Sequence, residues 1–177
     1  MPAARTPGSH AAPSGRDGAR RRYARVMEVT YHWRGDFENG EVNALHAEGF
    51  GHPVLADDWK GQVERHSLGW VCARDGDGLV GFVNVPWDGG THAFILDTLV
   101  TARARRQGIG TRMIAIAADE ARAAGCEWLH ADFDDHLRAS YFDACGFVPT
   151  DAGVVALSTR HHAAGGPKGG ACTRQGW

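Results

Sequence analysis

The most informative part of this chain is residues 96–112, which read L-D-T-L-V-T-A-R-A-R-R-Q-G-I-G-T-R. An apolar run ends at Val100, and a loop with three arginines follows it. Gly108-Ile109-Gly110 then opens the longest amphipathic pattern of the chain, over residues 108–124. Apolar residues recur there at helical spacing, with charged residues on the opposite side. The segment therefore predicts a strand, a basic loop and a helix in direct succession.

The start of this helix has the composition of an anion site. A helix N-terminus carries unpaired backbone N–H groups and a partial positive charge. Glycines allow an anion to approach the backbone closely, and arginines add charge, so the pattern predicts bound phosphate. The chain contains no Walker A string, and residues 108–113 lack the third glycine of the dinucleotide fingerprint.

The segments on either side alternate between strand and helix patterns. Asp36 is expected to cap the first helix and Gly49 to end it, and Asp75-Gly76-Asp77-Gly78 predicts a hairpin turn. This order indicates an α+β fold with a mixed, mostly antiparallel sheet of about seven strands and helices on both faces. The expected strands are 26–33, 68–74, 79–85, 93–100, 126–133, 147–148 and 154–157, and the expected helices are 36–48, 57–66, 108–124 and 137–145.

The length of 177 residues suits one domain, which we place at residues 26–159. Residues 1–25 are expected to be a disordered basic tail, and residues 160–177 a flexible C-terminal tail. The run Arg20-Arg21-Arg22 leaves open a nucleic-acid arm or a transit-like segment, and Met27 is an alternative start. No apolar run reaches the length of a membrane span or of a secretory signal, so neither is expected.

The four cysteines are spread along the chain without a CxxC pair. In a chain of this length they are typical of reduced thiols, which predicts a cytoplasmic protein without a zinc site. No metal is expected elsewhere, since His46 and His52 form no recognised ligand pair.

Two short motifs together resemble a known family. Arg105-x-x-Gly108-x-Gly110, between a strand and a helix, resembles the acyl-coenzyme A pyrophosphate loop of the GNAT superfamily of N-acetyltransferases. About 35 residues further on, Tyr141-Phe142-Asp143-Ala144-Cys145-Gly146-Phe147 is similar to the family's Tyr-x-x-x-Gly-Phe motif. The resemblance extends over residues 26–157, the whole body of the chain.

The resemblance implies acetyl-CoA as co-substrate and direct attack of an amine on its thioester in a ternary complex. Backbone groups of Leu99 and Val100 would hold the pantetheine arm. The pyrophosphate would lie on the backbone of Arg105, Arg106, Gln107, Gly108, Ile109 and Gly110, with Thr111 capping. Ala102 replaces the proline that the family usually carries after the strand.

Asp97 and Tyr141 are the candidate catalytic residues. Family members often carry an acidic residue at the position of Asp97, where it would accept the proton of the substrate ammonium. It could equally hold the cation, or be satisfied by backbone amides at a strand bulge. The family's general acid is a tyrosine at the position of Phe142, so Tyr141 looks transposed by one place, and water is the alternative acid. An acyl-cysteine route through Cys72 or Cys145 lacks a paired base.

The acceptor is expected to bind near Phe50, His52 and Trp87. Residues 26–159 carry ten basic and twenty acidic side chains, a balance of −10 that favours a cationic partner and disfavours nucleic acid. The sequence thus predicts acetylation of a small cationic amine such as a metabolite or antibiotic. A protein or peptide acetyltransferase and a non-catalytic acyl-CoA-binding regulator remain alternatives, and family members are often homodimers.

Overall fold

The computed structural model describes residues 28–155 and residue 157. The expected tails at 1–25 and 160–177 and the alternative start at Met27 lie outside the described residues. They stay predictions.

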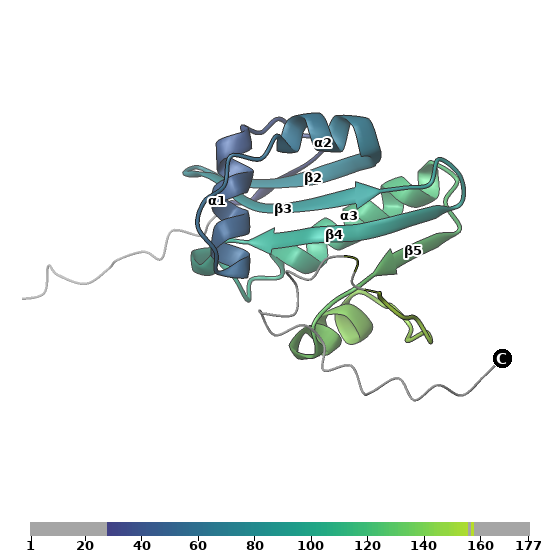
Figure 1. The fold of residues 1–177 in the computed structure, drawn as a ribbon. Coiled ribbons are helices and arrows are strands. Elements are labelled where there is room, and N and C mark those ends of the chain that lie inside the picture. The colour runs from purple at the N-terminus through teal and green to yellow at the C-terminus, as the bar shows by residue number, and fades with distance from the viewer. Residues whose placement is uncertain (1–27, 156, 158–177) are drawn as a thin grey trace, which may run out of the picture.

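The centre of the molecule is a mixed sheet in the order β1-β2-β3-β4-β5 (Figure 1). The first three pairings are antiparallel, and β4 pairs with β5 in parallel. The α+β class with a mostly antiparallel sheet is therefore confirmed. The strands are β1 (Thr30–Trp33), β2 (Ser67–Asp75), β3 (Gly78–Pro86), β4 (His92–Val100) and β5 (Trp128–Ala131).

Helices cover both faces of the sheet, as the sequence predicts. On one face, α1 (Asn39–Phe50) and α2 (Trp59–His66) bury a cluster with Phe82 and Leu99 at its base. On the other face, α3 (Ile109–Ala123) lies across β2, β3 and β4 (Figure 1). Its apolar side packs onto these strands, and Met113 is fully buried. The sheet is thus held between two apolar cores, and β4 contributes to both of them.

Helix α1 begins later and ends later than its sequence pattern predicts. Glu38, not Asp36, is its N-cap, because Glu38 and Glu41 form a reciprocal capping box. The helix runs through Gly49 and ends at Gly51, whose φ of +70° suits a left-handed C-cap. Gly49 has a packing role instead, since a Cβ there would lie 3.0 Å from Cδ2 of Leu99. The helix therefore lies close to β4.

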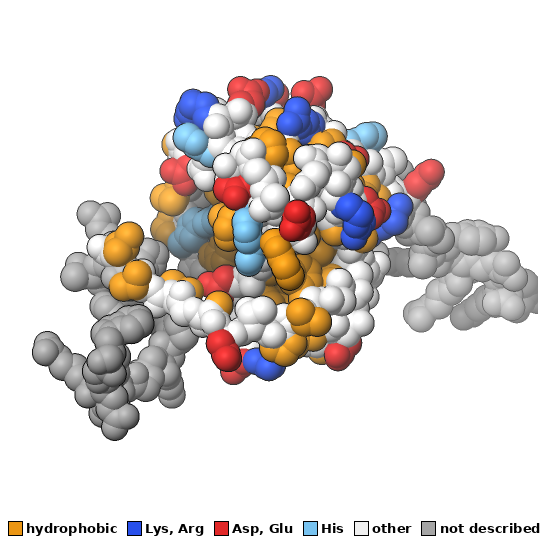
Figure 2. Space-filling model, turned by 90° about the vertical axis from the view of Figure 1, so that its right-hand side faces the viewer, with side chains coloured by type: hydrophobic (Ala, Val, Ile, Leu, Met, Phe, Trp, Pro, Cys, Tyr) orange, Lys and Arg blue, Asp and Glu red, His pale blue; other side chains and the backbone are white. Residues whose placement is uncertain are grey.

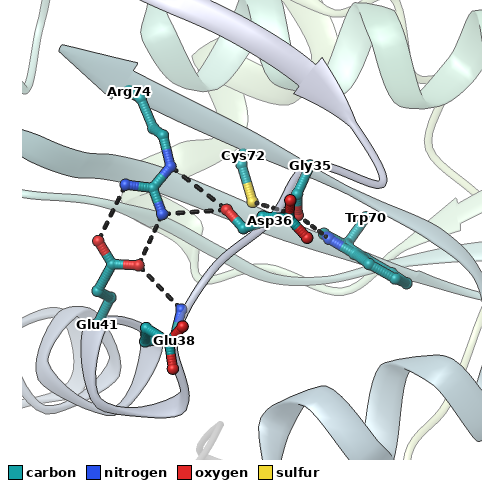
Figure 3. Close-up of polar contacts among 7 residues, drawn as sticks. All are labelled: Gly35, Asp36, Glu38, Glu41, Trp70, Cys72 and Arg74. Carbon is teal, nitrogen blue, oxygen red and sulfur yellow. Dashed lines mark hydrogen bonds and ion pairs between the residues drawn. The ribbon is translucent and has the colours of Figure 1, made fainter.

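A polar network fixes the link between β1 and α1 (Figure 3). The guanidinium of Arg74 donates to both carboxylate oxygens of Glu41, at 3.0 and 2.7 Å, and to the carbonyl of Asp36. Trp70 Nε1 and the Cys72 thiol both donate to the Gly35 carbonyl, at 2.8 and 3.3 Å. Strand β2 thereby holds the segment before α1 in place.

The C-terminal part of the body departs most from the prediction. The helix expected over 137–145 is a 3₁₀ turn (Asp135–Leu137) followed by a π-helical segment (Ala139–Ala144). The strands expected at 147–148 and 154–157 are absent from the described residues, so the described sheet has five strands and not seven. Pro149 cannot donate to a ladder, and Val148 is 73% exposed, so nothing fixes this segment as a strand.

Candidate active site

Strand β4 parts from β5 halfway along its length. The parallel pairs run from His92–Trp128 to Ile95–Ala131 and stop there. Two residues beyond Ile95, Asp97 adopts a φ of +52°, and the register of β4 against β3 shifts between Phe82 and Asn84. This β-bulge opens the sheet and aims the Asp97 side chain differently from a regular strand.

The bulge also exchanges the two faces of β4. Ile95 packs into the core under α3, whereas Leu99, four residues later, packs into the core under α1 and α2. In a regular strand residues at an even spacing share one face. The bulge therefore lets one strand serve both cores, and Asp97 lies where the faces change.

Asp97 is a partly buried carboxylate with polar neighbours on two elements. Its side chain is 21% exposed, and its Oδ1 lies 3.8 Å from Nε2 of His46 on α1. The amide of Asn84, itself buried and bonded through its oxygen to Ser67, hydrogen-bonds the carboxylate from β3. Burial raises the pKa of Asp97, and the contacts with His46 and Asn84 offset only part of that rise. A raised pKa suits a group that exchanges protons.

His46 is a site residue that the sequence analysis missed. Its Nδ1 lies 2.7 Å from Nε2 of His52, and Nδ1 of His52 lies 2.7 Å from the Pro53 carbonyl oxygen. Its ring packs against Phe50 at 4.5 Å and Trp59 at 5.2 Å. Only the position of His46 on the inner side of α1, one turn before Phe50, could have pointed to it. The predicted residues Phe50 and His52 are thus brought to Asp97 through His46.

Tyr141 points at the bulge from the other side. Its hydroxyl donates to Oγ1 of Thr98 at 3.2 Å, and its ring stacks on Phe133 at 4.2 Å. Burial raises its pKa, so the phenol is protonated at neutral pH. The π-helical segment turns Tyr141 toward the sheet, because its wider turn changes the angles between successive side chains. Phe142, at the family's usual tyrosine position, contacts Arg138 instead.

The basic loop after β4 forms the predicted helix start. Gly108 is the N-cap of α3 with a φ of +78°, and Arg105, Arg106 and Gln107 are exposed beside it. A Cβ on Gly110 would meet only Cγ2 of Val100, at 3.8 Å. The first N–H groups of α3 have no partner within the helix, and no side chain caps them.

Three further contacts fix this loop. Glu48 of α1 accepts from the Thr101 hydroxyl at 3.0 Å and from the Ala102 backbone at 2.7 Å. Arg103 pairs with Asp75 at 2.6 Å, so it ties the loop to the β2–β3 turn. Thr111 does not cap α3, and its hydroxyl instead bonds the Cys145 thiol. Glu48 is a second residue whose role the sequence analysis missed.

The backbone groups of Leu99 and Val100 point to opposite edges of β4. The Thr101 N–H donates to Val80 on β3, so Leu99, two residues earlier, also turns its backbone toward β3. Val100 turns its backbone to the open side, where Arg105 Nε donates to its carbonyl at 3.0 Å. The side chain of Leu99 is buried.

Trp87 lies apart from this cluster. Trp87 follows β3 and forms an isolated bridge with Ala93 of β4. Ala93 lies four residues before Asp97 along that strand. The carboxylate of Asp88 accepts from the Gly90 and His92 backbones, so it stabilises the turn. The structure therefore does not bring Trp87 to His46 and Asp97.

An open groove of about 870 Å³ lies where β4 and β5 part. Phe94 and Leu96 of β4, Thr111 of α3, residues 128–133 and residues 144–150 line it, whereas Asp97 and Tyr141 are not among its lining residues. Figure 2 shows hydrophobic side chains around a hollow on one side of the molecule, with histidines close by. Its volume is within the range of ligand pockets in proteins, roughly 300–1,000 Å³.

Cys72 is not suited to act as a nucleophile. Burial raises the pKa of Cys72 to about 12, so its thiol is protonated at neutral pH. Within residues 28–155, no group of three or more His, Cys, Asp or Glu side chains could hold a metal ion. In the same part of the chain, no helix has the length and apolar character to cross a membrane.

Comparison with known proteins assigns the family. The model of the acetyltransferase (GNAT) family matches residues 28–147, more than half of the chain. The chain therefore belongs to the GNAT acetyltransferase family, as its two motifs indicated. This family uses acetyl-CoA as the acyl donor, so the chain is an acyltransferase by family.

Individual relatives are more distant. The mycothiol acetyltransferase of Rhodococcus erythropolis is 37% identical over 60 residues, which are 34% of this chain and 20% of that protein. The match thus spans about a fifth of that relative's length. A probable acetyltransferase from methicillin-resistant Staphylococcus aureus superposes with a TM-score of 0.61 at 22% identity, over 73% of this chain and 98% of its own.

An aminoglycoside N-acetyltransferase solved in complex with CoA has the same fold. Its TM-score is 0.58 at 18% identity, and the match covers 77% of this chain and 98% of that chain. At such identities the likeness shows the fold alone.

Proposed function

We propose that this protein transfers an acetyl group from acetyl-CoA to the primary amine of a small cationic molecule. One observation carries the proposal. Asp97, a carboxylate with a raised pKa, lies in the bulge of β4, and Tyr141, a protonated phenol, reaches the next residue, Thr98, from the π-helical segment. A base and an acid therefore lie at the point where the sheet opens.

The residues beside the opening fit the CoA moiety. The N–H groups from Arg106 to Gly110 would hold the pyrophosphate at the start of α3, with Arg105 and Arg106 adding positive charge. Gly110 leaves this backbone uncovered, because a side chain here would project into the space beside Val100. The backbone N–H of Val100 would hold the pantetheine arm beside the carbonyl that Arg105 occupies, and Leu99 contributes by fixing the strand against β3.

When bound, acetyl-CoA supplies the thioester that the amine attacks. Asp97 takes the proton that the ammonium must lose before its nitrogen can form the new bond to the acetyl carbon. As the bond between that carbon and the sulfur breaks, the Tyr141 hydroxyl gives its proton to the departing thiolate. The hydrogen bond to Thr98 orients the hydroxyl, and solvent reprotonates the phenolate.

The acceptor side favours a cation. The body of the chain carries a balance of −10, which raises the local concentration of cationic substrates. The exposed ring of Phe50 lies beside His46 and provides an aromatic face for an ammonium group. Trp87 would contact the distal part of a long acceptor. A structural neighbour that acetylates aminoglycosides is consistent with such a substrate.

Turnover with a panel of amines tests the proposal. CoA release is followed with acetyl-CoA and, in parallel, polyamines, aminoglycosides, amino acids and lysine peptides. We expect acetylation of at least one small cationic amine and little of the peptides. Turnover of peptides alone would favour the protein acetyltransferase. Binding of acetyl-CoA without turnover of any amine would contradict the proposal and favour a regulator.

A further inference from the structure

The chain Asp97–His46–His52–Pro53 links the candidate base to the protein surface. It spans three segments, namely β4, α1 and the loop after α1. The two ring contacts of 2.7 Å are short hydrogen bonds, whereas the 3.8 Å between Asp97 Oδ1 and His46 Nε2 is longer than a hydrogen bond.

The end of this chain fixes where the protons lie. The Pro53 carbonyl can only accept, so Nδ1 of His52 carries hydrogen. In the neutral ring Nε2 of His52 is then an acceptor, and Nδ1 of His46 must donate to it. The remaining nitrogen, Nε2 of His46, is therefore bare and faces Asp97.

We infer that His46 and His52 form a proton relay that carries the substrate's proton from Asp97 to solvent; this inference rests on the proposed function. The proton on Asp97 moves to Nε2 of His46, the Nδ1 proton of His46 moves to Nε2 of His52, and His52 becomes the cation. His52 then gives its Nδ1 proton to water from its partly exposed ring, and proton exchange with solvent returns both rings to the Nδ1–H form before the next turnover. The first transfer requires Asp97 and His46 to approach by about 1 Å to reach hydrogen-bond length.

The surroundings of His46 support this role. Burial lowers its pKa, Asp97 on β4 raises it, His52 lowers it, and Asp57, from the same loop as His52, raises it. The pKa of the acid is raised and that of the base is lowered, so the two values move toward each other. A proton shared between two groups is transferred most easily when their pKa values are close.

His52→Gln tests the relay in the full-length enzyme. A glutamine can still donate to Pro53 and accept from His46, but it cannot pass a proton on. We expect kcat to fall by about tenfold or more with KM little changed. In His52→Ala, which leaves room for the ring, added imidazole should restore kcat. His66→Gln, at the exposed end of α2, is the matched control and should leave kcat unchanged. Unchanged kcat in His52→Gln, or a loss in His52→Ala that imidazole does not restore, would overturn the relay.

NMR of ¹⁵N-labelled histidines gives a second readout that needs no turnover. We expect the Nδ1–H tautomer for both His46 and His52, and a lower pKa for His46 in Asp97→Asn because that change removes an attractive charge. An Nε2–H tautomer at His46, or no shift in the variant, would overturn the relay even in an active enzyme. If the NMR results are as expected but the protein acetylates no amine, the proposed function is overturned and, with it, the role of the relay.

Discussion

Tyr141 donates its hydroxyl to Thr98, the residue that directly follows Asp97 in β4, at 3.2 Å. One strand bulge thus holds the candidate base and, at the next residue, the hydrogen-bond partner of the candidate acid. Because Asp97 has a positive φ, the side chains of Asp97 and Thr98 do not simply alternate as in a regular strand. The acid approaches from the π-helical segment and the base contacts α1.

Asp97→Asn should lower turnover about 100-fold at neutral pH, because the amide cannot accept the ammonium proton. The loss should shrink as pH rises, since more of the amine is then already uncharged. Asparagine tolerates the positive φ of this position, so the bulge is kept. A pH–rate profile of kcat/KM makes the measurement. An equal loss at every pH would assign Asp97 to substrate binding or to structure.

The same substitution should change stability in a pH-dependent way. Burial raises the pKa of folded Asp97, so between its unfolded and folded pKa values the folded state holds more protons than the unfolded state. Stability of the wild type therefore falls as pH rises through that window, and Asp97→Asn escapes this loss. Urea unfolding should show the variant gaining relative stability toward neutral pH, and a constant difference would contradict the raised pKa.

Tyr141→Phe should lower kcat at least about tenfold and leave KM nearly unchanged, because the thiolate loses its proton donor while the ring packing remains. Thr98→Val is the comparison, since it removes the hydrogen bond and keeps the phenol. It should cost less activity than Tyr141→Phe. If both variants lose the same activity, the hydrogen bond serves the structure; if Tyr141→Phe is fully active, water is the acid.

Gly110→Leu should weaken acetyl-CoA binding by at least about tenfold, because the side chain covers the backbone that an anion must approach. Gly40→Leu is the matched control. Gly40 is also the second residue of its helix, and a Cβ there meets nothing within 4 Å. Both variants should unfold no more easily than the wild type, since leucine favours helix over glycine by roughly 0.5–1 kcal/mol. Equal affinity in the two variants would contradict the placement of the pyrophosphate.

Cys72→Ser should retain full turnover. The protonated, buried thiol is not a nucleophile at neutral pH, and a serine hydroxyl can donate to the same Gly35 carbonyl. Mass spectrometry of wild type incubated with acetyl-CoA should detect no acetyl group on the protein. An acetylated Cys72, or an inactive variant that is folded, would restore the acyl-cysteine route.

The sequence was a good guide wherever local pattern sets the structure. The strand ending at Val100, the turn at Asp75–Gly78 and the long helix after Gly108 depend on apolar periodicity and glycine, and all three are present. The bulge at Asp97 is only one of the alternatives that the sequence leaves open, because the need to fill two cores with one strand is a tertiary requirement. His46 was missed for a similar reason, since its partners lie on β4 and in the loop after α1.

The wrong predictions also concern local structure. Glu38 and not Asp36 is the N-cap of α1 because Glu41 completes a capping box with Glu38, whereas the Asp36 carbonyl accepts from Arg74. The π-helical segment could not be read from the sequence, since its pattern resembles that of an α-helix over so short a stretch. It is nevertheless what turns Tyr141 toward Thr98.

Calorimetric titration of the full-length protein with acetyl-CoA at low salt tests the central claim most directly. The account predicts one-to-one binding in the micromolar range, and markedly weaker binding by Gly110→Leu than by Gly40→Leu. Absence of binding to a folded wild-type protein, or binding that Gly110→Leu leaves unchanged, would contradict the assignment of the segment from β4 to α3 as the acetyl-CoA site.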